Sequence, residues 1–164
     1  MRILTFVFFA MIVSACGKVK VASSKSAGGT VFDSAEKGKD VTDTSMCATG
    51  FPATTALGNW RMVHNQNGVE VVTILQISQN ATQVRNICRF ETRAVEALVQ
   101  IPSAVITSRK EIQFRDEADA TVEEAGFKCS VAAKIEVIYY EFDGSCLSVR
   151  ASNSPEAVTL IPNK

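Results

Sequence analysis

Residues 134–151 read KIEVIYYEFDGSCLSVRA, two runs of β-branched and aromatic residues on either side of Asp143-Gly144. An Asp-Gly pair between two such runs is typical of a β-hairpin with a type I′ turn. A two-residue turn at this pair places Glu141 opposite Cys146 and leaves Cys146 on the outer face of the hairpin. Four apolar side chains share the other face, which we predict to lie in the core: Ile138, Tyr140, Leu147 and Val149.

Segments of the same kind recur from Leu57 onward, separated by turn residues such as Asn67-Gly68 and Gln79-Asn80. We expect about eight to ten short strands, at 58–63, 69–78, 82–93, 95–101, 105–108, 111–115, 127–131, 134–142, 145–151 and 158–161. Residues 118–125 fit either a brief helical turn or a loop, and no long helix is expected.

A domain with this pattern is all-β, and we predict a small antiparallel up-and-down β-barrel. Closing the sheet hides its edge strands, whose unpaired backbone groups otherwise invite aggregation. A barrel of about eight strands can be filled by its own side chains or can hold one small ligand. The strand pattern leaves both of these alternatives open.

The sequence Leu57-Gly58-Asn59-Trp60 opens the first expected strand. It resembles the G-x-W signature of lipocalin-like (calycin) barrels, in which the glycine permits a tight entry and the tryptophan plugs the barrel floor. The resemblance implies that Gly58 and Trp60 are barrel-floor residues; the alternative is that Trp60 is an ordinary core residue of a first strand. The further motifs of the lipocalin family are not evident in the sequence, so the resemblance implies no ligand pocket.

The chain has five cysteines, and lipidation of Cys16, argued below, leaves Cys47, Cys88, Cys129 and Cys146. An even number of widely spaced cysteines in an exported protein is typical of disulfides. The sequence has no C-x-x-C pair of the kind that zinc sites favour, so we predict two disulfides and no metal site. Three pairings are possible. The outward direction of Cys146 favours Cys47–Cys146, through an N-terminal segment that crosses outside the barrel or at its rim, together with Cys88–Cys129.

The first 15 residues have the parts of an export signal. Arg2 is positively charged, Ile3–Val13 is an apolar run of about 11 residues, and small residues follow. The run is too short to span a hydrocarbon layer of about 30 Å. Val13-Ser14-Ala15-Cys16 resembles the lipobox of bacterial lipoproteins, which implies that residues 1–15 are removed and that Cys16 becomes the first residue, carrying fatty chains such as palmitate. The alternatives are an ordinary secretory signal with an incidental cysteine and an uncleaved membrane anchor.

Residues 16–45 are small, polar and mixed in charge, without a helix or strand period. Such a segment cannot bury enough apolar surface to fold alone, so we predict a disordered, flexible tether with a mean reach of about 30 Å. Residues 46–164 then form the β-barrel domain. Gly17, rather than Asp, follows Cys16, which by analogy with Gram-negative sorting favours the outer membrane over the inner one.

Charge and histidine content give no indication of nucleic acid binding or of catalysis. Lys plus Arg and Asp plus Glu number 17 each, and no basic patch suits a nucleic acid partner. The single histidine, His64, lies beside an Asn-Gly turn signal without a nucleophile motif, so we expect it at the surface or in a turn. The acidic residues between Asp116 and Glu124 lack the spacing of a calcium loop, and we expect them in a solvated loop. No cofactor is expected.

The leading hypothesis is an envelope lipoprotein, held in the membrane by its N-terminal lipid, that presents a non-catalytic barrel as a binding or structural module. Its partner would be a small apolar ligand or an envelope protein. One alternative is a periplasmic protease inhibitor, because some lipocalin-like envelope barrels block metalloproteases with an N-terminal trunk, which residues 42–51 could supply. A second alternative is a hydrolase, which requires an open cleft with converging polar groups.

Overall fold

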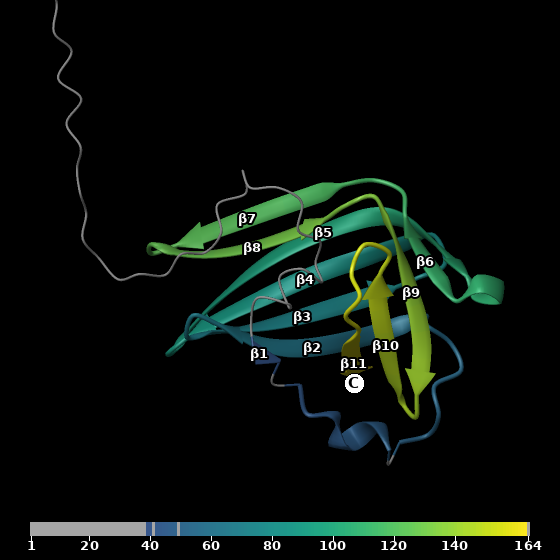
Figure 1. Cartoon of the computed structure of the whole chain (residues 1–164). Helices are drawn as coiled ribbons and strands as arrows, with labels where there is room; N and C mark the ends of the chain where they lie inside the picture. The colour runs from purple at the N-terminus through teal and green to yellow at the C-terminus, as the bar shows by residue number, and fades with distance from the viewer. Residues whose placement is uncertain (1–38, 41, 49, 164) are drawn as a thin grey trace, which may run out of the picture.

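The computed structural model describes residues 39–40, 42–48 and 50–163 of the 164-residue chain (Figure 1). The leader, Cys16 and the predicted tether up to residue 38 lie outside the described residues. The described strands are β1 (Lys39–Asp40), β2 (Gly58–Gln66), β3 (Val69–Ile77), β4 (Ala81–Phe90), β5 (Arg93–Ile106), β6 (Glu111–Phe114), β7 (Ala118–Glu124), β8 (Phe127–Ala133), β9 (Glu136–Asp143), β10 (Cys146–Ala151) and β11 (Val158–Pro162). Two short 3-10 helices, η1 (Thr44–Cys47) and η2 (Thr107–Arg109), complete the elements.

Eight of these strands form a closed antiparallel barrel, which confirms the predicted fold class. They pair in the order β2-β3-β4-β5-β6-β9-β10-β11, and β11 pairs back onto β2. The chain therefore runs up and down around the barrel, except that β7 and β8 are inserted between β6 and β9.

The join between β2 and β11 is the shortest in the described barrel. Its register consists of Ile161 opposite Arg61 and Pro162 opposite Trp60. One further backbone hydrogen bond, from the N–H of Asn163 to the carbonyl oxygen of Asn59 (2.9 Å), extends it. Farther along β2, β1 takes the place of β11 and pairs with Asn65 and His64. We call the β2–β11 join the seam.

The barrel core consists of the inward-facing side chains of every barrel strand. Along β4 and β5 buried residues alternate with more exposed ones, which is the period of a strand with one face in the core. The largest fully buried apolar side chains are Met62, Leu75, Ile101, Ile138, Leu147 and Leu160. Burying one such side chain stabilises the fold by about 1.5–3 kcal/mol.

The hairpin of β7 and β8 forms a separate two-stranded sheet that packs over β4 and β5 (Figure 1). The buried side chains of β8 join the barrel core: Phe127, Cys129, Val131 and Ala133. β8 contacts the face of β4 that carries the buried residues Val84 and Cys88. The hairpin therefore covers the inner face of the long strands, where they extend beyond the short strands β6 and β9–β11.

Several expected strand boundaries were wrong, and the largest difference is in β5. Residues 95–101 and 105–108 were expected to form two strands, but Arg93–Ile106 is continuous in β5. The ladder changes partner at Pro102, because β5 pairs with β4 up to Pro102 and with β6 from Ser103 onward. A proline lacks the N–H that a ladder uses and is tolerated where pairing changes.

Residues 118–125 were expected to form a helical turn or a loop, and this expectation was also wrong. Ala118–Glu124 is strand β7, paired along its whole length with β8. Its acidic residues Asp119, Glu123 and Glu124 are exposed, since the strand lies on the outside of the molecule. Local composition indicated solvent exposure correctly, but the pairing depends on β8, which the core holds in place.

The last hairpin was placed in the correct segment with the wrong register. Cys146 lies opposite Asp143, not opposite Glu141, and the turn residues are Gly144 and Ser145. Gly144 has a φ of 57°, the sign that a type II′ turn requires at its first central position. The pairing is shifted by two positions, which keeps every side chain on its predicted face. The four predicted core residues of this hairpin are buried accordingly: Ile138, Tyr140, Leu147 and Val149.

Candidate functional site

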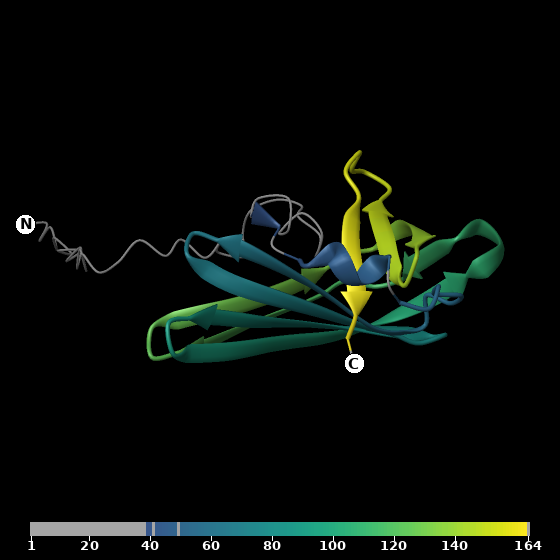
Figure 2. The ribbon, with the colours of Figure 1, turned by 90° about the horizontal axis from the view of Figure 1, so that it is seen from below.

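The segment between β1 and β2 crosses the outside of the barrel. We call residues 42–48 and 50–57 of this segment the strap. Its helix η1 lies against β10 and β11 (Figure 2), where Cys47 packs with Cys146 and Ile161 in a small buried cluster of their own. A disulfide joins Cys47 to Cys146 with a Cα–Cα distance of 5.0 Å. The strap then leads into β2, so it spans the seam from outside.

Hydrogen bonds hold the strap to the β9–β10 turn at several points. The N–H of Ser145 donates to the carbonyl oxygen of Cys47 (2.9 Å), and its hydroxyl donates to the carbonyl oxygen of Met46 (2.9 Å). The N–H of Ala53 donates to the carbonyl oxygen of Gly144 (2.8 Å). Ser145 therefore bonds to the strap from the turn itself, which accounts for the difference between the observed register and the predicted one.

Two glycines allow the strap and the turn to approach closely. A β-carbon at Gly144 would overlap the carbonyl oxygen of Cys47, and one at Gly50 would overlap the side chain of Ser145. Gly50 also donates its N–H to the carbonyl oxygen of Met46 (3.2 Å). The strap therefore contacts the turn on both sides of Phe51, at Gly50 and at Ala53. Before Phe51, the Cys47–Cys146 disulfide also attaches it to β10.

Phe51 stands out of this fixed segment. Its side chain is 96% exposed, the largest exposed fraction among the large hydrophobic residues described. Met46 at 39% and Leu57 at 37% are the other large apolar side chains exposed on the strap. The strap therefore presents an apolar surface outside the barrel.

The strap carries little charge of its own. Asp43 is the only charged residue of positions 42–57. Its carboxylate oxygen Oδ1 accepts a hydrogen bond from the N–H of Ser45 (3.0 Å) and caps η1. Hydrogen bonds from the side chain and the backbone of Ser45 lower the pKa of Asp43, so this exposed carboxyl stays ionised at neutral pH.

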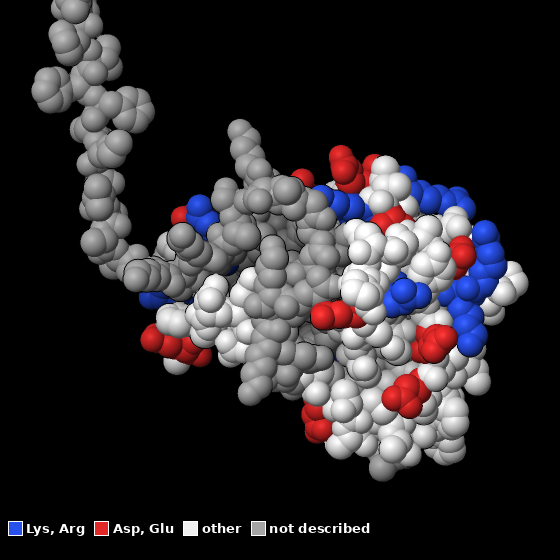
Figure 3. Space-filling view, viewed as in Figure 1, with Lys and Arg blue, Asp and Glu red and all other residues white. Residues whose placement is uncertain are grey.

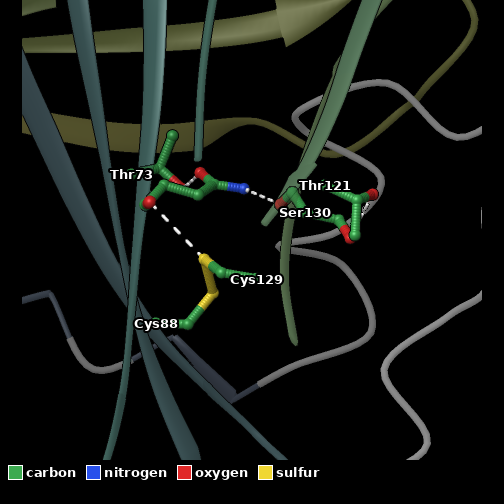
Figure 4. Close-up of a disulfide and its surroundings, with 6 residues drawn as sticks. Thr73, Cys88, Thr121, Cys129 and Ser130 are labelled. Carbon is green, nitrogen blue, oxygen red and sulfur yellow. Dashed lines mark hydrogen bonds between the residues drawn. A yellow bond between two sulfur atoms is a disulfide. The ribbon is translucent and has the colours of Figure 1, made fainter. Parts of the chain in front are cut away.

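A second constellation lies inside the barrel, where β8 meets β4 (Figure 4). Cys88 and Cys129 form a disulfide there with a Cα–Cα distance of 5.6 Å. The Thr73 hydroxyl donates to Asn86 Oδ1 (2.8 Å), and Asn86 Nδ2 donates to the carbonyl oxygen of Ser130 (2.8 Å). Thr73 and Asn86 are buried, and their polar groups are satisfied by each other and by the hairpin. This arrangement connects the hairpin to β3 and β4 through buried hydrogen bonds.

The cysteine pairs that the hairpin geometry favoured, Cys47–Cys146 and Cys88–Cys129, are the two disulfides of the structure. Gly58 begins β2 with a φ of 133°, a conformation that favours glycine. Trp60 is buried in the barrel core, and its indole N–H donates to the carbonyl oxygen of Ala56 (2.8 Å). Its role as a barrel floor stays a prediction.

His64 was expected at the surface or in a turn, and this was wrong. It lies in β2 on the same face as Trp60 and Met62 and is only 1% exposed. The turn lies at Asn67-Gly68 as predicted, but β2 continues to Gln66 instead of ending at Val63, so His64 lies inside the strand. His64 is therefore buried in the way that a core residue is.

The part of the chain that the structure describes places no group of three or more His, Cys, Asp or Glu side chains where they could hold a metal ion. No helix among the described residues is long and apolar enough to cross a membrane. No family model, no curated protein and no solved structure matches the chain.

Sequence reasoning named Phe51 only as the end of a possible trunk and did not single it out. The available signal was a lone aromatic residue between Cys47 and the first strand, in a stretch without strand alternation. A hydrophobic residue outside any periodic pattern has no predicted place in the core, and such residues merit attention as surface anchors.

Proposed function

We propose that this chain is a lipid-anchored envelope protein whose barrel is a non-catalytic scaffold for binding a protein partner. The observation that carries the proposal is the single apolar cluster inside the barrel. Inward-facing side chains of the barrel strands form one apolar cluster, and β8 of the inserted hairpin adds to it. A barrel whose inward-facing side chains pack against one another favours recognition on its outer surface over storage of a small apolar ligand.

The anchor is inferred from the sequence around Cys16, which lies outside the described residues. Two or more fatty chains on one residue hold a protein firmly in a membrane. The tether would then carry the barrel away from the lipid surface. The described strand β1 begins at Lys39, so the tether proposed here is about 22 residues long, with a mean reach of about 26 Å.

Intact mass and cell fractionation test the anchor. We expect the wild-type chain to lose residues 1–15, to gain acyl mass and to fractionate with membranes. The Cys16→Ser variant should gain no acyl mass and should leave the membrane fraction, whereas the control variant Ser14→Ala should behave like wild type. Recovery of wild-type protein with its leader intact, or without acyl mass, would overturn this part of the proposal.

Native mass spectrometry after mild detergent extraction tests the scaffold. We expect the barrel to carry no small molecule through extraction, because its inward-facing side chains pack against one another. A co-purifying apolar molecule, bound in constant proportion to the protein, would instead support a ligand carrier.

Inhibition of an envelope protease is a second candidate function, favoured by the strap. Lipocalin-like barrels that block metalloproteases use an N-terminal trunk, and the strap here presents exposed residues on a disulfide-clamped segment. Incubation with a panel of metallo-, serine and cysteine proteases tests the idea. An absence of inhibition at micromolar excess would end it.

A further inference from the structure

The strap combines an exposed aromatic side chain with a backbone that is attached to the barrel on both sides of it. Phe51 is 96% exposed, and the barrel core gains nothing from it. On either side, Cys47 is covalently bound to Cys146 and the N–H of Ala53 donates to Gly144. A side chain presented from a fixed segment loses little conformational freedom on binding, which is the condition under which a single anchor contributes strongly to affinity.

The charges near the strap restrict what can bind there. The exposed acidic residues Asp43, Glu141 and Asp143 lie on the strap and on the strand that leads into the turn it contacts. Figure 3 shows acidic and no basic side chains around this lower end of the molecule in that view. Two copies meeting through this surface would bring like charges together, and an anionic lipid surface would be repelled. A partner with basic residues around an apolar pocket matches it in charge.

We propose that Phe51 inserts into an apolar pocket of a protein partner whose pocket rim carries Lys or Arg. The inference rests on the proposed function, since it names the surface through which the scaffold binds. Aromatic residues at the centre of an interface, surrounded by a polar rim, are the usual binding hot spots. Met46 and Leu57 are the other large apolar side chains that the strap exposes to a partner.

Site-specific photocrosslinking in cells identifies the occupant. The full-length chain carries benzoylphenylalanine at position 51 or, as the matched control, at position 135, since Ile135 is 65% exposed and lies outside the strap. We expect one protein adduct at position 51 and none of that mass at position 135. No adduct at 51, an adduct with a second copy of this chain, or an adduct with lipid only would each overturn the proposal.

Affinity then tests the chemistry with the crosslinked protein, purified and identified. We expect Phe51→Ala to weaken its binding at least 10-fold, which corresponds to about 1.4 kcal/mol, and Phe51→Trp and Ile135→Ala to leave it within about threefold of wild type. Raising the salt concentration should weaken binding, since the rim contacts are ionic. Equal affinities for wild type and Phe51→Ala would overturn the proposal.

Two controls separate this inference from the proposed function. Phe51→Ala should keep the wild-type urea midpoint, because its side chain is exposed, and should still fractionate with membranes. Loss of binding by Phe51→Ala while Cys16→Ser stays in the membrane fraction would refute the anchor alone. If the acylated protein is anchored in the membrane but Phe51→Ala binds the partner as tightly as wild type, only the inference is refuted.

Discussion

Gly144 occupies a position where both the backbone and the surrounding space exclude a β-carbon. Its φ of 57° costs an L-residue about 1–2 kcal/mol, and the carbonyl of Cys47 fills the space beside it. We expect Gly144→Ala to lower the free energy of unfolding by about 3 kcal/mol or more, measured by urea denaturation with the disulfides intact.

Gly68→Ala is the matched control for this prediction. Gly68 also has a positive φ, 83°, but nothing lies within 4 Å of the β-carbon position. Its substitution should cost only the backbone preference, about 1–2 kcal/mol. Equal losses in the two variants would mean that the close approach of strap and turn is not important for stability.

Asn86 links three strands through one buried amide. Replacing it by Ala leaves the hydroxyl of Thr73 and the carbonyl of Ser130 without this partner, and we expect a loss of about 2–3 kcal/mol in the free energy of unfolding. Combining Asn86→Ala with Thr73→Val should cost less than the sum of the two single changes, since the second removes the orphaned hydroxyl. A double-mutant cycle measures this coupling, and strict additivity would argue against it. Thr121→Val, at an exposed hydroxyl pair with Ser130, should change stability by less than about 0.5 kcal/mol.

At the scale of single elements, strand faces were predictable and strand partners were less so. The faces of β9 and β10 follow from alternation, and they survived a two-position error in register because the side-chain period is two. The register itself depends on hydrogen bonds from Ser145 to Met46 and Cys47, almost a hundred residues earlier in the chain. Local turn preference contains no information about such a distant contact.

The β7–β8 hairpin shows the same limit. Its acidic strand gave no strand signal, because β7 is exposed along most of its length and is held by pairing with β8. The position of β8 depends in turn on Cys129 and on contacts inside the barrel. For the candidate site, strand alternation and the number of cysteines sufficed to favour the disulfide pairs. The exposure of Phe51 could not be predicted in this way, because it depends on the three-dimensional course of the strap.

The Cys88–Cys129 disulfide should stabilise the hairpin more than the rest of the barrel. It joins cysteines 41 residues apart, and the chain-entropy model assigns such a loop about 4 kcal/mol. In the double variant Cys88→Ala/Cys129→Ala we expect faster hydrogen exchange throughout β7 and β8, with β2 and β3 still protected. Uniformly faster exchange in all strands would show that the hairpin is an inseparable part of the barrel.

At the scale of the whole molecule, closure of the barrel depends on the seam, where β2 and β11 pair over a short stretch. The Cys47–Cys146 disulfide and the strap connect β10 to the start of β2 across this seam. The cysteines are 99 residues apart, so removal of the bond relaxes a loop that includes nearly all of the barrel, a change of about 4–5 kcal/mol in the chain-entropy model.

We therefore expect the double variant Cys47→Ala/Cys146→Ala to lose stability in every barrel strand together. Urea unfolding followed by Trp60 fluorescence and by hydrogen exchange should shift to lower urea by the same amount with both probes, because a barrel cannot keep its ladder once the seam opens. In the double variant Cys88→Ala/Cys129→Ala, by contrast, Trp60 fluorescence and hydrogen exchange should shift by different amounts. If exchange rose only in the strap while Trp60 kept its wild-type midpoint, the disulfide would be an attachment for the strap, and the seam would be stable without it.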